Sequence, residues 1–251
     1  MGDRVAARTR DVVVRATGVD KIYSSQAERV VAVGGVTLSV HEGEFVCLMG
    51  PSGCGKSTLL NLLAGLDRPD SGSVEVCGVV LDDLTDAERA AHRLATTGYV
   101  FQEHRLLPEL TAVENVMLPL EVAGRRVAEA ERTSLAALAT VGLDGLGRRY
   151  PDELSGGQRQ RVGVARALVG GRRLILADEA TGALDSETSR SIYQLLAELA
   201  ADGTTVVAAS HDPEVAHWAT RIVTMRDGVV VRDEESPSRS VGPDALAEAH
   251  G

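Results

Sequence analysis

Features typical of membrane-spanning and secreted proteins are missing from this sequence of 251 residues. No stretch approaches the run of about 18 apolar residues that a membrane-spanning helix requires. The start of the chain, Met1–Arg4, lacks the apolar segment of a secretory signal. We therefore expect the protein to stay in the cytosol.

Cysteine is scarce. The chain has three, Cys47, Cys54 and Cys77, and they form no C-x-x-C pair. An odd and widely spaced set argues against a disulfide framework or a zinc site. It fits small buried side chains in a reducing compartment.

Positive charge is also in short supply, since 26 Lys and Arg residues face 36 Asp and Glu residues. A net charge of −10 argues against a broadly basic surface, so we expect no nucleic-acid partner, although this charge leaves room for a local basic groove. A hydrophobic fraction of 44% at this length allows one substantial core, or one core with a small satellite domain.

The most informative segment is a glycine-rich loop between an apolar run, Phe45–Met49, and a helix-forming run, Leu59–Ala64. Glycines let the backbone turn its N–H groups around an anion, and the helix N-terminus adds partial positive charge. In such a loop Lys56 reaches the terminal phosphates of a nucleotide and Ser57 ligates Mg²⁺. The residues predicted to hold the nucleotide here are Gly50, Pro51, Ser52, Gly53, Cys54, Gly55, Lys56, Ser57 and Thr58.

A second motif is the apolar run Leu174–Ala177, which ends in Asp178 and Glu179. A carboxylate at the end of a buried strand is costly unless a cation compensates it, and nucleotide-bound Mg²⁺ would do so. We predict that Asp178 holds the metal and that Glu179 faces the attacking water. The alternative is a pair of solvated acids in an ordinary loop.

A third motif, Leu154–Gln158, stands directly before a helix-forming segment. Ser155 followed by Gly156 and Gly157 at a helix start makes a second anion-binding turn. Taken alone, the same residues also fit a simple capped loop.

Strand and helix patterns alternate along the chain, which predicts an α/β fold. An antiparallel edge is predicted where Asp227-Gly228 joins two apolar runs. The predicted strands are Val12–Arg15, Val30–Val40 (broken near Gly34-Gly35), Phe45–Met49, Val74–Val76, Tyr99–Phe101, Leu174–Ala177, Thr205–Ala209, Ile222–Met225 and Val229–Val231, and the predicted helices follow Lys56 and cover Val127–Thr140, Gln158–Val169 and Glu187–Ala201.

The order of the three motifs resembles that of ATP-binding cassette (ABC) ATPases. Leu154–Gln158 looks like their signature sequence, placed between the phosphate loop and the Asp178-Glu179 pair. The segment Thr111–Leu120 and the residues after Glu179 are similar to the branch of stand-alone cassettes for lipoprotein release, macrolide export and cell division (LolD-, MacB- and FtsE-like). The resemblance covers about Val12 to Arg232.

The resemblance implies a P-loop NTPase core of RecA type with an antiparallel β edge and an inserted α-helical subdomain. The cassette would span residues 10–235, with a core of about 10–102 and 158–235, a helical subdomain of about 103–157, and a flexible tail, 236–251. One departure is Ala180, where the family usually has proline after the Asp-Glu pair. The missing ring leaves that loop one more free dihedral.

Further site residues follow from the resemblance alone. Tyr23 resembles the aromatic that stacks on adenine, and Gln102 the glutamine that links the core to the helical subdomain and joins the metal site. Asp185 resembles an interface aspartate, and His211 the switch histidine at the γ-phosphate. The simpler alternatives are a surface aromatic for Tyr23, a strand cap for Gln102 and a helix cap for Asp185.

In this family two cassettes face head to tail, so Ser155, Gly156, Gly157 and Gln158 of one subunit would close over ATP and Mg²⁺ in the other. The implied catalytic residues are Glu179, His211, Lys56 and Gln102, and the implied metal ligands are Ser57, Gln102 and Asp178. The resemblance implies a homodimer that energises an integral FtsX-like permease at the cytoplasmic face of the membrane. The alternatives are a regulatory cell-envelope cassette without cargo transport and a soluble ABC ATPase.

Overall fold

The computed structural model describes residues 11–24, 29–182 and 184–236. Its strands and helices, in chain order, are β1 (Val12–Ser24), β2 (Arg29–His41), β3 (Phe45–Met49), α1 (Lys56–Leu63), β4 (Ser71–Val76), β5 (Val79–Val80), α2 (Asp86–Thr96), β6 (Thr97–Val100), α3 (Ala112–Val122), α4 (Val127–Thr140), α5 (Gly156–Leu168), β7 (Leu174–Asp178), α6 (Ser186–Ala201), β8 (Thr205–Ser210), β9 (Arg221–Arg226) and β10 (Val229–Glu235). Short 3₁₀ turns occupy Leu81–Asp83, Pro151–Glu153 and Pro213–His217. None of the helices in these ranges is both long and apolar enough to span a bilayer.

The strands form two sheets. One has six strands in the order β10-β9-β3-β8-β7-β6, and the other has four in the order β2-β1-β4-β5. All pairs of the larger sheet are parallel except β9 with β10, which forms the predicted antiparallel edge. The predicted α/β class is therefore confirmed.

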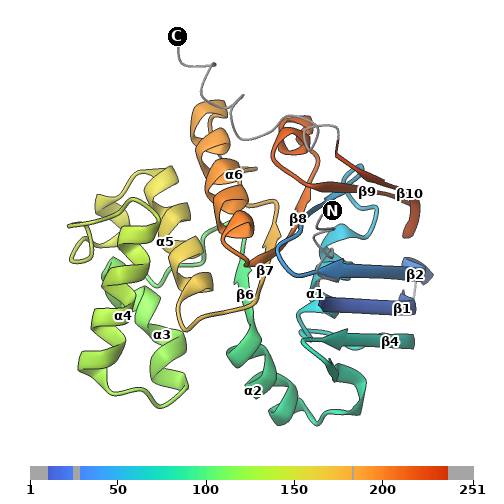
Figure 1. Ribbon diagram of the computed structural model, residues 1–251, viewed down its shortest axis with the longest axis horizontal. Coiled ribbons are helices and arrows are strands. Elements are labelled where there is room, and N and C mark those ends of the chain that lie inside the picture. Colours follow the sequence, from blue (N-terminus) through green and yellow to red (C-terminus); the bar gives the residue numbers. More distant parts are fainter. Residues whose placement is uncertain (1–10, 25–28, 183, 237–251) are drawn as a thin grey trace, which may run out of the picture.

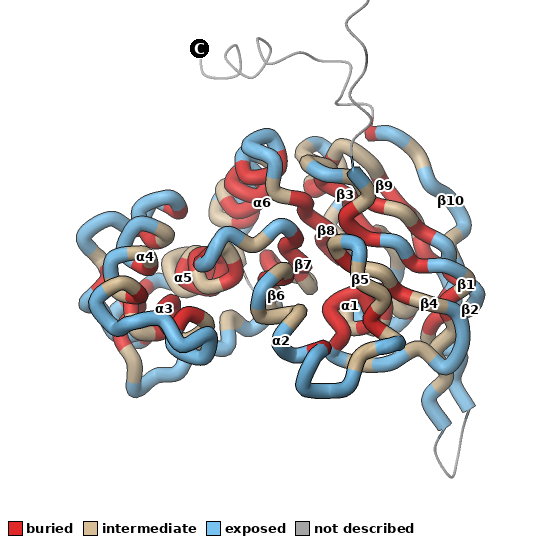
Figure 2. The backbone as a smooth tube through the Cα atoms, turned by 60° about the horizontal axis from the view of Figure 1, so that its bottom comes forward, coloured by how far each residue is buried: buried red, intermediate tan, exposed pale blue. Residues whose placement is uncertain are grey.

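Helix α1 lies between the two sheets, whereas α3, α4, α5 and α6 gather on the other side of the larger sheet (Figure 1). Side chains of β3 alternate between the two sides, as expected for a strand buried on both faces. Phe45 and Cys47 join the core under the helices, while Val46 and Leu48 join the core around α1. Figure 2 shows the resulting buried centre, with exposed residues along the outer helices and the loops.

Parallel register places the carboxyl ends of the central strands at one edge. Met49 pairs with Ser210, Asp178 with Ala209, and Val100 with Ala177. The segments that follow these strands therefore emerge side by side, although they are far apart in sequence. In open α/β sheets this edge is where ligands bind.

Several predicted elements were too short or were missed. β1 continues to Ser24, well beyond Arg15, because it stays paired with β2 although polar residues and Gly18 interrupt its apolar pattern. β2 is continuous, but its register with β1 shifts near Gly34-Gly35, where Gly35 has a φ of 61°. Helix α2 was not predicted, although Thr85 and Glu88 form a capping box at its start.

The segment between Glu103 and Gly157 contains the helices α3 and α4 and no strand, as its composition predicted. Strand β10 continues to Glu235, four residues beyond the predicted end. Of the predicted tail, 236–251, the structure describes only Ser236, whose Oγ donates a hydrogen bond to the carbonyl of Ala216. The domain boundaries stay a prediction.

Candidate functional site

The phosphate loop joins β3 to α1, as predicted. Its glycines have backbone conformations that other residues rarely adopt, with φ of 81° at Gly53 and 102° at Gly55. A Cβ at Gly55 would lie 2.0 Å from the carbonyl oxygen of Ala32, and one at Gly50 would lie 2.3 Å from that of Met225. Sterics as well as dihedral angles therefore require glycine at these positions.

Lys56 is buried at the first position of α1, with 4% of its surface exposed. Its ammonium group donates hydrogen bonds to the carbonyl oxygens of Gly50 at 2.7 Å and Pro51 at 3.0 Å. The loop thus curves around its own lysine. An anion cradled by the loop amides would lie within reach of this charge.

Ser57 and Asp178 face each other across the sheet edge, with the Ser57 hydroxyl 2.8 Å from a carboxylate oxygen of Asp178. The Tyr99 hydroxyl lies 3.4 Å from the other carboxylate oxygen. Burial raises the pKa of Asp178, and the hydrogen bond from Ser57 opposes this effect. Because burial outweighs the hydrogen bond from Ser57, the negative charge of Asp178 is only partly stabilised by the protein. A bound cation would stabilise it further.

Within the described ranges, no three His, Cys, Asp or Glu side chains come together in a metal cluster. The donor set at Ser57 and Asp178 is one hydroxyl and one carboxylate. Mg²⁺ is typically held by one or two protein oxygens together with waters and substrate phosphates. These residues therefore fit a nucleotide-bound Mg²⁺ rather than a metal held by protein alone.

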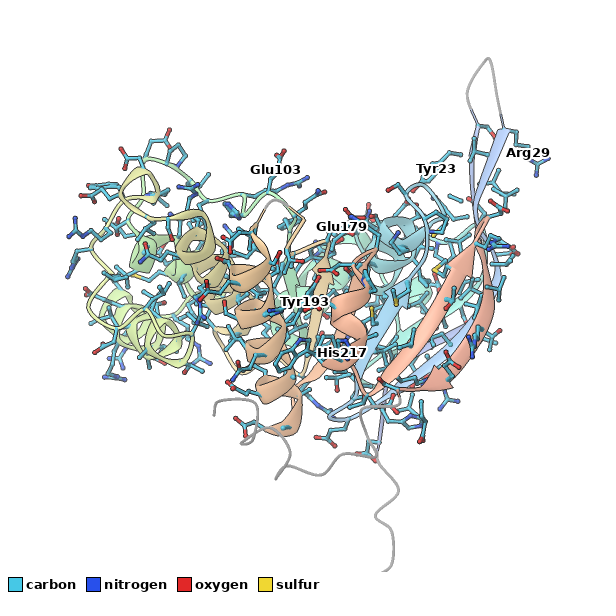
Figure 3. All side chains as sticks on the ribbon, turned by 90° about the horizontal axis from the view of Figure 1, so that it is seen from above. Tyr23, Arg29, Glu103, Glu179, Tyr193 and His217 are labelled. Carbon is cyan, nitrogen blue, oxygen red and sulfur yellow. The ribbon has the colours of Figure 1, made fainter. Side chains whose placement is uncertain are left out.

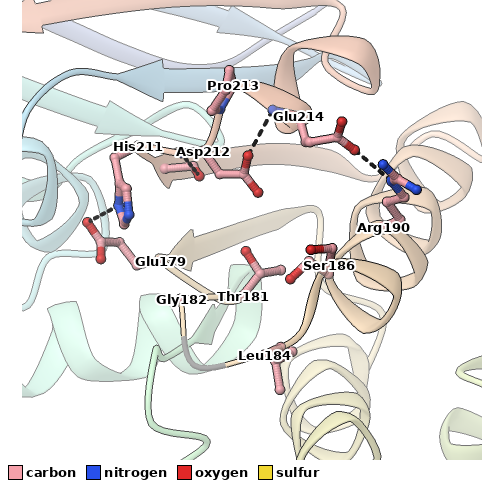
Figure 4. Close-up of a pocket in the computed structure, with 12 residues that line it drawn as sticks. Glu179, Thr181, Gly182, Leu184, Ser186, Arg190, His211, Asp212, Pro213 and Glu214 are labelled. Atoms are coloured by element: carbon pink, nitrogen blue, oxygen red, sulfur yellow. Dashed lines mark hydrogen bonds and ion pairs between the residues drawn. The ribbon is translucent and has the colours of Figure 1, made fainter.

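Glu179 follows β7 in a left-handed backbone conformation, with φ of 44°. Its N–H donates to the carbonyl of Ala209 on the neighbouring strand β8. Its carboxylate lies 3.4 Å from Nδ1 of His211, which follows the end of β8. Both line a pocket of about 370 Å³ that opens beside the turn Thr181-Gly182 (Figure 4).

Gln102 follows β6 and has an exposed side chain. Its amide nitrogen would be 3.1 Å from a Cβ added at Gly182, so it lies against the turn that follows Glu179. The structure therefore brings Gln102 to the same edge as Asp178, Glu179 and His211.

Tyr23 lies near the end of β1, close to the phosphate-loop edge where Glu179 also lies (Figure 3). Its hydroxyl donates to Asp67, and the ammonium of Lys21 lies 5.4 Å from its ring centroid. The residue is 45% exposed. A half-exposed ring anchored by its hydroxyl is geometrically available for stacking.

The signature segment occupies a different place. Ser155 caps α5, its Oγ accepting a hydrogen bond from the Gln158 N–H while the Gln158 side chain accepts one from the Ser155 N–H. A Cβ at Gly157 would lie 2.4 Å from the Thr188 methyl group. Within the described ranges, the side-chain hydrogen bonds of Ser155 and Gln158 join these two residues to each other and not to the phosphate loop.

Asp185 caps α6 by accepting hydrogen bonds from the Thr188 N–H and hydroxyl. The simpler predictions, a capped loop at Ser155 and a helix cap at Asp185, thus describe what these residues do within one chain. Gly156 also lies against Leu184, since a Cβ there would be 3.4 Å from the leucine methyl group. The two segments predicted to meet a second cassette are therefore neighbours.

Two tyrosines near the site were not singled out from the sequence. Tyr99 contacts Asp178 and also donates to Asn61. Tyr193 is buried in α6 and contacts Thr181 and Ser210. Neither belongs to a motif with a fixed spacing, and only the packing of α6 and β6 on the sheet brings them to the site.

Comparison with known proteins places this geometry in context. The profile of the ABC transporter family matches residues 33–182. The chain is 44% identical to the uncharacterised ABC transporter ATP-binding protein YknY of Bacillus subtilis, over 92% of this chain and 100% of that one. It is 42% identical to the macrolide export ATP-binding/permease protein MacB of Chromobacterium violaceum, over 91% of this chain but only 35% of that protein.

Among solved structures, the ATP-binding cassette MJ0796 is similar with a TM-score of 0.82 and 43% identity. The likeness covers 88% of this chain and 98% of that one, and MJ0796 is there a dimer in a post-hydrolysis state bound to ADP and Pi. A protein of the same name from Methanocaldococcus jannaschii is 44% identical over 89% of this chain. The chain therefore belongs to the ABC transporter family, within which it is an ATP-binding cassette.

Proposed function

We propose that this cassette hydrolyses ATP and energises a separate membrane permease through ATP-driven, head-to-tail dimerisation. One observation carries the proposal. Lys56, Ser57, Asp178, Glu179 and His211 converge at one edge of the sheet, whereas Ser155 caps a helix outside that group. Each chain thus presents a nucleotide site and, separately, a segment able to cover a second one.

ATP fits the cradle by charge and shape. The loop amides and Lys56 would hold the phosphates, and the exposed face of Tyr23 would stack on adenine, worth roughly 1–3 kcal/mol by analogy with base stacking. Ser57, Asp178 and Gln102 would hold Mg²⁺. The metal, when bound, neutralises charge on the phosphate oxygens.

Glu179 would polarise the attacking water, because its carboxylate lines a pocket together with His211 at the carboxyl ends of β7 and β8. His211, which contacts Glu179 at 3.4 Å, would orient that carboxylate and approach the γ-phosphate. Phosphoryl transfer to water depends mainly on positioning and charge stabilisation, so rigid placement of these two side chains is the protein's main contribution.

Dimerisation would complete the site. Ser155 to Gln158 present helix N–H groups and a hydroxyl at the start of α5, which suits a phosphate. In a head-to-tail pair these groups would cover the nucleotide held by the other chain, and Asp185 would lie at the interface. The solved MJ0796 cassette is a dimer with ADP and Pi, which supports this arrangement.

A permease would dock at an apolar pocket of about 600 Å³ that opens beside α2 and α3. Tyr99 and Phe101 are part of its lining. Its lining includes the apolar residues Leu94, Leu118, Pro119 and Val122 and the charged residue Arg166. We assign it to a short amphipathic cytoplasmic helix of the permease, and we propose that Gln102 and the segment 103–115 also meet the permease. MacB, whose name joins ATP-binding and permease, is about three times as long as the part matched here.

The experiment is reconstitution with the membrane protein encoded beside this one. The cassette should co-purify with it, and ATP turnover should rise in the complex. Val122→Asp places a charge in the apolar pocket at a position that is 76% exposed, so it should abolish co-purification without unfolding the cassette. Val127→Asp, at a 66% exposed position outside the pocket, is the matched control.

If the cassette binds the permease fully but its ATP turnover does not rise in the complex, the regulatory alternative would be favoured. Equal capture of wild type and Val122→Asp would contradict this docking site. Absence of any ATP hydrolysis, with or without the permease, would overturn the enzymatic proposal itself. The cassette would be found at the cytoplasmic face of the membrane only while the permease holds it.

A further inference from the structure

A buried chain of hydroxyl groups runs beneath the candidate site. Tyr193 of α6 lies with its hydroxyl 2.5 Å from Oγ1 of Thr181 and 3.2 Å from Oγ of Ser210. The Ser210 oxygen also accepts a hydrogen bond from the Asp212 N–H at 3.0 Å. All three hydroxyl residues are at most 7% exposed. Figure 3 shows Tyr193 on α6, and Figure 4 shows Thr181 among the residues that line the pocket.

The two ends of this chain belong to the segments that carry Glu179 and His211. Thr181 is two residues after Glu179, in a turn closed by a hydrogen bond from the Gly182 N–H to the Glu179 carbonyl. Ser210 and Asp212 flank His211 on either side. The Tyr193 hydroxyl therefore bridges the glutamate turn and the histidine loop from below.

The glutamate turn needs such support. Glu179 has a φ of 44°, a conformation that a non-glycine residue keeps only when its surroundings hold it. Ala180 follows, so no proline ring restrains the turn at that position. The Thr181–Tyr193 hydrogen bond adds to the backbone hydrogen bonds of the turn a side-chain link to helix α6.

A second link from the same face of α6 is weaker. Arg190, one turn before Tyr193, donates to Glu214 on the histidine loop at 2.7 Å. Both side chains of this ion pair are largely exposed, at 61% and 41%, so water and salt screen it. The buried hydroxyl chain is not screened in this way, and its members polarise one another in a low-dielectric interior.

We propose that Tyr193 is a positioning residue, whose hydroxyl fixes the Glu179 turn relative to the His211 loop so that both side chains face the same water and phosphate. The proposal rests on the proposed ATP hydrolysis at this site. The Tyr193 hydroxyl contacts Thr181 and Ser210 rather than Glu179 or His211, so it acts through these two neighbours. It goes beyond the motif residues because no spacing pattern marks Tyr193.

The test is the KM and kcat of ATP hydrolysis for the full chain with Tyr193→Phe. Loss of one buried hydroxyl should lower kcat about 3- to 10-fold, the equivalent of a typical hydrogen bond, with KM for ATP changed less than about 2-fold. Ile192→Val is the matched control, because Ile192 is adjacent, fully buried and apolar. It should leave kcat unchanged.

Double variants test whether Tyr193 acts through its hydrogen bond to Thr181. Thr181→Val combined with Tyr193→Phe should reduce kcat no more than the worse single variant, since both remove the same hydrogen bond. Additive losses would overturn the bridging role, as would a Tyr193→Phe enzyme with unchanged kcat or with a raised KM at constant kcat. A merely structural role would lower the melting temperature of both Tyr193→Phe and Ile192→Val and spare kcat in both.

Wild type and Glu179→Gln are assayed in parallel. Active wild type with an unimpaired Tyr193→Phe would overturn this inference alone. Inactive wild type, or a fully active Glu179→Gln variant, would instead overturn the proposed catalytic site. If Tyr193→Phe proves too unstable to assay, Ser210→Ala tests the other half of the bridge and should show the same selective loss in kcat.

Discussion

The carboxylate of Glu179 and the imidazole of His211 face each other, with Oε1 of the glutamate 3.4 Å from Nδ1 of the histidine. The contact joins the ends of β7 and β8, which are adjacent parallel strands. It is loose for a hydrogen bond, as catalytic contacts often are before substrate binds. Closure of a second cassette would be the event that tightens it.

Changing Glu179 to glutamine should separate binding from hydrolysis. The amide keeps the size of the side chain but cannot act as a base, so turnover should fall on the order of 10²–10⁴-fold while ATP affinity is retained. Steady-state ATPase and nucleotide titration measure the two quantities. Glu187→Gln, an exposed acid in the first turn of α6, is the control. Near wild-type turnover for Glu179→Gln would remove Glu179 from this role.

Changing Ser155 should impair hydrolysis without preventing ATP binding to the separate chain, because its proposed contact forms only in the dimer. Ser155→Ala also loses a helix cap, which costs about 1 kcal/mol of stability. Thr85→Ala removes an equivalent capping box at α2 and controls for that loss. Ser155→Arg should be more severe by blocking closure. Loss of ATP binding by isolated Ser155→Ala monomers would contradict a site completed by the partner.

The α/β class was predicted from the sequence, and the roles of the site residues stay a prediction. Glycine spacing and the Asp178-Glu179 pair follow from local chemistry, and parallel register then brings them together at the strand ends. Strand lengths were underestimated where polar residues and glycine interrupt the apolar pattern of a paired strand, as in β1 beyond Arg15. Such pairing depends on the partner strand, which is distant in sequence and invisible to a local pattern.

Roles that depend on tertiary packing could not be predicted. Helix α2 is short and mostly polar, and its sequence has Leu94 as its one large aliphatic side chain, although the Thr85 capping box was a usable signal. Tyr193 is one of several residues in α6 with a helical pattern. Only the approach of α6 to both Thr181 and Ser210 gives its hydroxyl a place near the site.

Neutralising Asp178 should stabilise the nucleotide-free cassette while removing its response to metal. Burial raises the pKa of this carboxyl, so at neutral pH its charge is held at a cost in folding free energy. Asp178→Asn keeps the shape and can still accept from Ser57. Its melting temperature at pH 7 in EDTA should exceed that of wild type, at about 2–4 °C for each kcal/mol gained.

The second part of this prediction concerns ligand. Wild type should gain stability on addition of ATP with Mg²⁺, and less with ATP and EDTA, whereas Asp178→Asn should respond equally to both. Asp152→Asn, an exposed acid far from the phosphate loop in sequence, is the control and should keep the metal response. A lower melting temperature for Asp178→Asn in EDTA would mean that Asp178 stabilises the fold rather than a metal.

Two glycines of the phosphate loop should differ when changed to alanine, because only one is enclosed. Both have positive φ, so each substitution costs roughly 1–2 kcal/mol of backbone strain. A Cβ at Gly53 would meet nothing within 4 Å, but one at Gly55 would lie 2.0 Å from the Ala32 carbonyl. Gly53→Ala should therefore fold with a modest loss of ATP affinity, while Gly55→Ala must displace the loop from β2 and lose binding at least 10-fold, the effect of about 1.4 kcal/mol. Equal affinities for the two variants, measured by titration with a fluorescent nucleotide, would show that the loop shape seen here is not the one that binds ATP.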